Sequence, residues 1–192
     1  GCPASVEFHP DGGSLVVAER DQSVHIYDCR KLGGNAGNNT NMASTSTPVA
    51  SHDLKPFVVQ ECHFSPCGEY LMAATKSPDG MGTVRILPTL PVPTSMDEEA
   101  KHDDNGCYTL VGHTGSIFCL RVSPDGRHLA TGGADALVGL WDTTDMVCTS
   151  TITRLQKFIR SVSYSHDSRL LASSSCERMI DIAAVGGGGG SG

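Results

Sequence analysis

Three side chains of the kinds found in hydrolase triads lie in the stretch 110–142, namely His113, Thr131 and Asp135. A hydroxyl, an imidazole and a carboxylate in contact can activate the hydroxyl for nucleophilic attack. Hydrolases of this type commonly place the nucleophile in a Gly-x-Ser-x-Gly turn, and no serine of this chain has that setting. The three residues also coincide with a pattern that recurs along the chain, so a structural role is favoured over catalysis.

Two further sets of residues could bind metal ions. Eight cysteines are scattered along the chain, but no Cys-x-x-Cys pair of the zinc-site type occurs. The carboxylates of 97–99 and 103–104 lack the alternating spacing of a calcium loop and are interpreted as a solvated charge run. Scattered thiols usually pack as small apolar residues in a reducing compartment. We therefore expect no metal ion and no other cofactor.

The stretch 110–142 has the pattern of an antiparallel meander. Alternating or apolar runs are separated by reversals that are rich in Gly, Pro and Asp. In order, these are the run 117–122, the turn Ser-Pro-Asp-Gly of 123–126, the run 129–131, the turn 132–135 and the run 138–142. Such punctuation indicates short strands that pair with their neighbours in sequence.

The same order of runs and turns occurs four times. From the first turn to the position of Trp141 the spacing is seventeen residues in three units, and four residues more in the remaining one. The residue pairs are Pro10 and Tyr27, Pro66 and Leu87, Pro124 and Trp141, and His166 and Ala183. The units occupy approximately 4–51, 57–111, 112–151 and 158–185. Many short strands joined by turns predict an all-β protein.

The segments between and after these units differ in composition. Residues 31–55 are rich in Gly, Asn, Ser and Thr, and residues 88–106 are rich in Pro and acidic residues, so both are predicted to be loop insertions. A short outer strand is expected near 47–51, and residues 186–192 form a Gly-rich flexible tail. The net charge of −7 and the lack of basic clusters argue against binding to nucleic-acid backbone or to an anionic membrane.

Residues 110–142 resemble one blade of a WD40-repeat propeller, a family in which a blade begins with Gly-His and ends with Trp-Asp. The resemblance implies that His113, Thr131, Asp135 and Trp141 form a buried structural tetrad linked by hydrogen bonds. It also implies a β-propeller in which this chain supplies about four blades of a ring that mostly has about seven. We therefore expect a ring that does not close, in a fragment or in a chain that associates with itself.

The last two units are similar to the family of third subunits of the THO complex. The similarity rests on the Ala-Asp-Ala-Leu-Val turn before Trp141-Asp142. It rests also on Ile180-Asp-Ile-Ala183, which stands in place of the usual Trp-Asp of the next blade. The resemblance is close over 110–185 and loose over the first hundred residues.

This second resemblance implies a non-catalytic scaffold subunit of the nuclear THO/TREX assembly, which couples transcription to messenger-RNA processing and export. Its partners would be other THO/TREX subunits, with messenger RNA contacted only indirectly and with no membrane and no small-molecule substrate. The possible partner-binding loops are Asp135, Ala136 and Leu137 in the third unit and Cys176, Glu177 and Arg178 in the fourth.

Two alternatives stay open at the level of sequence. A generic WD40 adaptor, such as a ubiquitin-ligase substrate receptor or a chromatin peptide reader, would use the same fold. The Trp-Asp-x-Arg signal of such receptors is absent, because Thr143-Thr144 follows Asp142. A propeller-based hydrolase or lyase would need acids and bases at the channel mouth. The candidates are His25, His63, Asp21 and Asp181, which are assigned to different blades with no shared spacing.

Overall fold

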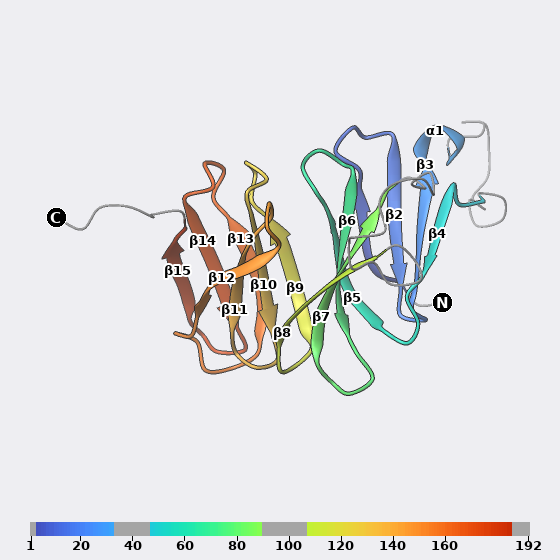
Figure 1. Cartoon of the computed structure of the whole chain (residues 1–192). Coiled ribbons are helices and arrows are strands. Elements are labelled where there is room, and N and C mark those ends of the chain that lie inside the picture. Colours follow the sequence, from blue (N-terminus) through green and yellow to red (C-terminus); the bar gives the residue numbers. More distant parts are fainter. Residues whose placement is uncertain (1–2, 33–46, 90–106, 186–192) are drawn as a thin grey trace.

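The computed structural model describes residues 3–32, 47–89 and 107–185 of the 192-residue chain. These residues form fifteen β-strands and one short α-helix. The strands build four antiparallel sheets that stand side by side like the blades of a propeller (Figure 1). The prediction of an all-β fold made of successive antiparallel blades is therefore confirmed.

Each blade is a meander of strands that are neighbours in sequence. The first blade contains β1 (Pro3–Phe8), β2 (Ser14–Glu19), β3 (Ser23–Asp28) and β4 (Ala50–Asp53), and the helix α1 (Cys29–Leu32) follows β3. The second contains β5 (Val58–Phe64), β6 (Tyr70–Lys76), β7 (Gly82–Pro88) and β8 (Tyr108–His113). The third contains β9 (Ile117–Val122), β10 (His128–Gly133), β11 (Val138–Asp142) and β12 (Val147–Ile152). The fourth has three strands among the described residues, β13 (Ile159–Tyr164), β14 (Leu170–Ser175) and β15 (Ile180–Ala184). Within the described ranges, no helix has the length and apolar character that a membrane crossing needs.

The first hairpin of each blade is closed by a turn of one kind. In the third blade the amide of Gly126 donates to the carbonyl of Ser123 at 2.8 Å, and the Ser123 hydroxyl donates to Asp125 at 2.6 Å. That hydroxyl bond is the main reason why the pKa of the Asp125 carboxyl is lowered from its usual value. Gly126 has a φ of 75°, which a residue without a Cβ adopts without strain. The equivalent residues Gly12, Gly68 and Ser168 also have positive φ. This shared turn explains the constant spacing in the sequence.

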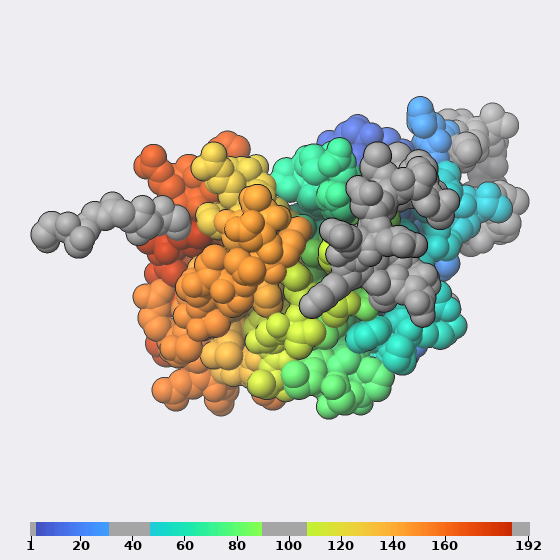
Figure 2. Space-filling view, viewed as in Figure 1, coloured from blue at the N-terminus to red at the C-terminus, as the bar shows by residue number. Residues whose placement is uncertain are grey.

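The first strands of successive blades lie side by side. β1 packs against β5, β5 against β9, and β9 against β13. The blades follow one another across the molecule in chain order (Figure 2). The first and the fourth blade lie at opposite ends of this row, so the described residues form an arc that does not close (Figure 1).

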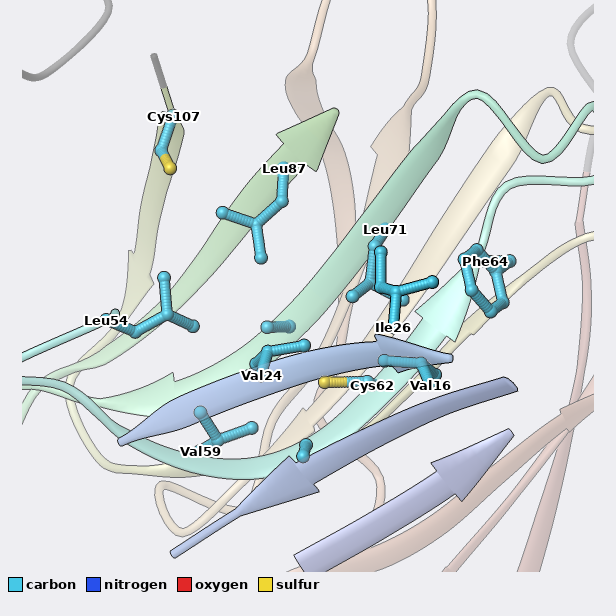
Figure 3. Packing of buried hydrophobic residues seen from close by; sticks show 12 residues of the cluster. Val16, Val24, Ile26, Leu54, Val59, Cys62, Phe64, Leu71, Leu87 and Cys107 are labelled. Carbon is cyan, nitrogen blue, oxygen red and sulfur yellow. The ribbon is translucent and has the colours of Figure 1, made fainter. Parts of the chain in front are cut away.

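Apolar side chains fill the space between neighbouring blades. Successive residues of a strand point to opposite faces of the sheet, so each blade can bury one set of side chains against the preceding blade and another against the following blade. Val16, Val24 and Leu71 lie between the first and second blades (Figure 3). Met72, Leu120 and Trp141 lie between the second and third, and Val138, Leu140 and Ile159 between the third and fourth. The core is thus a series of layers between sheets.

Two local features differ from the sequence prediction. The predicted loop 31–55 is wrong at its C-terminal end, because residues 50–53 form β4 and pair with β3. The sequence places this outer strand near 47–51, a few residues too early. The helix α1 has no counterpart in the sequence analysis, since four residues are too few to show a helical period. Residues 33–46, 90–106 and 186–192, which make up most of the predicted insertions and the tail, lie outside the described residues.

Replacing Val138 by Ala is expected to lower the free energy of unfolding by about 2 kcal/mol, because apolar carbon is removed from a packed layer and a cavity remains. Val138 is 1% exposed. The matched change Val147→Ala in the neighbouring strand should cost no more than about 0.5 kcal/mol, since Val147 is 50% exposed. Urea denaturation followed by circular dichroism measures both values, and equal losses would contradict the placement of Val138 in the core.

Candidate functional site

Four side chains form a chain of hydrogen bonds between the second and third blades, and we call them the tetrad. His113 ends β8, Thr131 lies in β10, Asp135 lies in the turn after β10, and Trp141 lies in β11. His113 Nδ1 is 3.0 Å from each carboxylate oxygen of Asp135, and Nε2 is 2.8 Å from Thr131 Oγ1. The Trp141 indole N–H donates to the same oxygen at 2.9 Å. Because β8 belongs to the second blade, these bonds join two blades.

The shortest of these bonds fit one arrangement of protons. An indole nitrogen can only donate, so Thr131 Oγ1 accepts from Trp141 and donates its own proton to His113 Nε2. His113 is then the neutral tautomer with its proton on Nδ1, and this N–H donates to Asp135. Every polar group of the tetrad is paired in this arrangement. An unpaired member would cost about 1–3 kcal/mol at this depth.

Two glycines make room for the tetrad. A Cβ on Gly139 would lie 2.8 Å from Thr131 Oγ1 and 2.9 Å from Trp141 Nε1. A Cβ on Gly112 would lie 2.5 Å from the indole atom Cη2. Carbon atoms cannot approach so closely without a shift of their neighbours. The Gly of the Gly-His pair and the Gly before Leu140 are therefore explained by packing against the tetrad.

The tetrad is closed to substrates. Thr131 is 0% exposed, and His113 and Trp141 are 2% and 4% exposed. A nucleophilic hydroxyl must come within contact distance of the atom that it attacks. This geometry suits a clamp between two blades and does not suit nucleophilic catalysis by Thr131.

The fourth blade has different residues at the equivalent positions. Leu155 stands where His113 is expected, and Ala183 stands at the position of Trp141. Both are buried and apolar. Ser173 takes the place of Thr131, and its hydroxyl is buried without a hydrogen-bond partner among the described residues. The fourth blade thus keeps the hydroxyl but lacks the ring groups that would use it.

Two of the residues proposed for acid-base chemistry meet in the first blade. The Ser23 hydroxyl donates to Asp21 at 2.6 Å and lies 3.1 Å from His25 Nε2. Asp21 and His25 thus lie in the first blade, within the predicted unit 4–51, whereas His63 lies in the second blade and Asp181 in the fourth. The other ring nitrogen, His25 Nδ1, lies 2.9 Å from the Ser51 hydroxyl of β4. Because the serine stands between carboxylate and imidazole, the order of a catalytic triad does not arise.

The other two candidates for acid-base chemistry contact separate partners. His63 contacts the carboxylate of Glu7 across the first two blades. Asp181 receives two bonds from the Arg154 guanidinium, at 2.8 and 2.9 Å. The structure therefore does not bring His63 and Asp181 into one site.

Burial lowers the reactivity of two cysteines, because it disfavours the thiolate form of their side chains. Burial raises the pKa of the Cys119 thiol to about 12, and it raises the pKa of Cys62 well above its usual value. Both side chains are therefore protonated near neutral pH, whereas a metal ligand or a nucleophile is a thiolate. Among the described residues, no group of three His, Cys, Asp or Glu side chains is arranged to hold a metal ion.

An ion pair that the sequence analysis missed joins the first strands of the second and third blades. Glu61 Oε1 lies 2.8 Å from Arg121 Nη1, and Glu61 Oε2 accepts from the amide of Leu120 at 2.9 Å. A bulge between Val59 and Glu61 interrupts the regular pairing of β5 with β6. No local spacing could have revealed a contact between residues so distant in sequence.

The two predicted partner-binding loops occupy equivalent hairpins. Asp135, Ala136 and Leu137 connect β10 to β11, and Cys176, Glu177 and Arg178 connect β14 to β15. Besides contacting His113, the Asp135 carboxylate accepts from the amides of Thr114 at 3.0 Å and Leu137 at 3.3 Å. Its side chain is thus used inside the protein, whereas Cys176 and Arg178 are exposed.

Two phenylalanines that the sequence analysis missed lie beside the second loop, together with Arg160. The rings of Phe118 and Phe158 are 6.1 Å apart, and the Arg160 guanidinium lies 5.2 Å from the Phe118 ring. The amide of Cys176 donates to the carbonyl of Phe158 at 3.2 Å. Phe158 is 52% exposed, and its position just before β13 is the only hint in the sequence. We call Phe118, Phe158, Arg160, Cys176 and Arg178 the loop surface.

Comparison with protein families matches most of the blades. The family model described as WD domain, G-beta repeat matches residues 3–28, 105–142 and 146–182, which together are more than half of the chain. The matched segments include the whole tetrad. The unmatched part contains β5, β6 and β7, where Leu87 replaces the Trp and the hairpin is longer.

Curated proteins with similar sequences include several WD-repeat proteins. THO complex subunit 3 of Arabidopsis thaliana is 30% identical over 94% of this chain and 48% of its own length. WD repeat-containing protein AAC3 of Dictyostelium discoideum is 29% identical over 84% of this chain and 29% of its own length. Protein hir1 of Aspergillus terreus is 30% identical over 84% of this chain and 13% of its own length. The chain spans about half of the first relative and less of the other two.

Exchanging Thr131 for Val is expected to lower the free energy of unfolding by about 2–4 kcal/mol, because the Trp141 indole and His113 Nε2 both lose their partner. The matched control is Ser173→Ala in the fourth blade, where no described group depends on the hydroxyl. That change should be neutral within about 0.5 kcal/mol or slightly stabilising. Urea unfolding followed by the fluorescence of the single tryptophan measures both values. A neutral Thr131→Val would show that the tetrad does not clamp the blades.

Proposed function

The chain belongs to the WD40-repeat family, and from this premise we propose that it is a non-catalytic scaffold subunit of the THO/TREX complex. The observation that carries the proposal is the 30% identity with THO complex subunit 3 over 94% of the chain. In this role it acts in the nucleus, in messenger-RNA processing and export. Its blades hold other THO/TREX proteins, and those partners contact the messenger RNA.

The use of polar groups supports a scaffold. The hydroxyl, imidazole and carboxylate of the tetrad are hydrogen-bonded to one another inside the protein. Asp181 is likewise paired with Arg154, and His63 contacts the carboxylate of Glu7. A propeller whose polar residues fix the blades offers rigid loops and edges to partners.

The charge of the chain supports indirect contact with RNA. The net charge is −7, and nucleic-acid backbone is bound mainly by Lys and Arg that replace counterions. An acidic scaffold repels the phosphates unless it presents a basic patch. Contacts with protein partners carry no such penalty.

The loop surface is the part of the molecule that we assign to a partner. Phe158 offers an exposed aromatic ring, and aromatic residues together with Arg dominate binding energy at protein interfaces. Neither Arg160 nor Arg178 has an ion-pair partner within the ranges that the structure describes. Two unpaired guanidinium groups beside a phenyl ring fit a partner segment with an apolar side chain next to carboxylates.

Affinity capture from nuclear extract tests the assignment. The tagged chain should recover THO subunits and other mRNA-export factors, identified by mass spectrometry against a tag-only control. Recovery of cullin ligase subunits or histone-modifying enzymes in their place would move the chain to another class of WD40 adaptor.

Phe158→Ser should reduce the recovery of THO subunits about tenfold or more, since a central aromatic anchor contributes roughly 2 kcal/mol or more to binding. Val147→Ser removes an equally exposed apolar side chain outside the loop surface and should leave recovery unchanged. Quantitative mass spectrometry of the captured subunits gives the ratio. Equal recovery by the two variants would place the partner elsewhere on the protein.

A further inference from the structure

The hairpin between β6 and β7 is longer than its counterparts in the other blades. From the first turn to the position of Trp141, the second blade has four residues more than the other three. Pairing of β6 with β7 continues to Lys76 and Gly82, and residues 77–81 form the loop beyond it. This loop lines a hollow of about 420 Å³. The hollow belongs to an internal blade, because the second blade packs against the first and the third.

The lining of the hollow is largely apolar. Its apolar side chains come from Phe57, just before β5, from Pro78 and Met81 of the loop, and from Val111 of β8. Val111 is 60% exposed. Among the described residues that line the hollow, Asp79 is the only one with a charge. The hollow thus combines an apolar interior with one carboxylate.

The other blades have polar or small residues at the equivalent positions. A bulge at one place in β5, β9 and β13 gives a common register from which the positions are counted back. Where the second blade exposes Val111, the first has Asp53 and the third has Thr153, and both are exposed. Phe57 stands where a glycine precedes β9 and a lysine precedes β13. The apolar hollow is therefore a feature of the second blade and not of the repeat.

Hydrogen bonds within the loop fix its shape and the charge of its carboxylate. The amide of Gly80 donates to the carbonyl of Ser77, and the amide of Ser77 donates to the carbonyl of Met81, both at 2.9 Å. The Met81 amide donates to the Asp79 carboxylate at 3.1 Å, and the Ser77 hydroxyl donates to the same oxygen. This hydroxyl bond is the main reason why the pKa of the Asp79 carboxyl is lowered from its usual value. Asp79 is exposed and carries its negative charge at neutral pH.

A buried arginine fixes two other parts of the lining. The Arg85 guanidinium of β7 lies 4.7 Å from the centre of the Phe57 ring, and its Nη1 donates to Thr109 Oγ1 at 2.5 Å. Arg85 is 5% exposed, so these contacts lie inside the protein. With the ring and the loop both held in place, the hollow exists before a ligand arrives. Binding to a preformed site costs less conformational entropy.

We propose that the hollow binds a peptide segment of a protein partner in which an apolar side chain lies next to a lysine or arginine. The apolar side chain is buried against Val111 and Met81, and the cation pairs with the Asp79 carboxylate. The volume of about 420 Å³ is within the range of roughly 300–1,000 Å³ that ligand sites occupy. Both this carboxylate and the net charge of −7 attract a basic segment. The inference does not depend on the proposed function, because the hollow shares no residue with the loop surface.

Peptide selection on the purified chain tests the proposal. A random peptide library displayed on phage is first depleted on the Val111→Lys variant, which removes peptides that bind other surfaces, and is then selected on the unmodified chain. Enriched sequences should carry an apolar residue next to Lys or Arg. Fluorescein-labelled synthetic copies should bind the Val111→Lys variant about tenfold or more weakly, because the new cation lies in the hollow. The matched control Val147→Lys, at a valine that is 50% exposed outside the hollow, should bind as the unmodified chain does. Circular dichroism should show the same strand content in all variants.

A second variant tests the role of the carboxylate. Asp79→Asn keeps an oxygen that can accept from Ser77 and Met81 but removes the charge, so it should weaken binding about two- to fivefold, as expected for an exposed ion pair. Replacing the basic residue of the peptide by Gln should cause the same loss and no further loss with the Asp79→Asn chain. Enrichment of acidic peptides, or no enrichment at all, would overturn the proposal. Self-association in light scattering that Val111→Lys abolishes would also overturn it, because the occupant would then be a second copy of the chain.

Discussion

A single hydroxyl oxygen between the second and third blades is the shared hydrogen-bond partner of two buried ring side chains. Trp141 and His113 bring an indole and an imidazole into the interior, and both rely on Thr131 Oγ1, at 2.9 and 2.8 Å. The turn that presents Asp135 and the strand end that presents His113 must converge on this atom. The close approach of Gly139 to the same oxygen has the same cause. Because His113 comes from the second blade, satisfying buried polar groups also fixes one blade against the next.

The fourth blade shows that this arrangement is a local clamp and not a condition of the fold. Leu155 and Ala183 fill the positions of imidazole and indole with apolar atoms, and the hairpins of the blade are unchanged. Ser173 keeps a hydroxyl that nothing described there uses. Leaving this one hydroxyl unpaired destabilises the fold less than burying an additional unpaired ring nitrogen beside it would. The blade itself therefore depends on strand alternation and on the turn with positive φ, and the tetrad adds rigidity where it occurs.

Features that depend on residues close together in the sequence could be predicted from the sequence. The spacing from Pro124 to Trp141 follows from one hairpin and one reversal, so the recurring spacing predicted every blade and placed the strands within a few residues. Contacts between blades could not be predicted in this way, because they join residues that are distant in the sequence. Glu61 and Arg121 meet only because β5 lies beside β9, and Phe118 and Phe158 meet only because β9 lies beside β13. The link between Asp21 and His25 was not predicted, because Ser23, which joins them, has no chemical signature of its own.

The loop surface and the interior of the described residues use their polar groups in different ways. The loop surface combines an exposed phenyl ring with guanidinium groups, so recognition there depends on charge and can be made and broken. The polar side chains of the tetrad are paired with one another and take no part in such recognition. A molecule built in this way can keep a fixed core while exchanging partners at its loops, which is what a scaffold within a larger assembly requires.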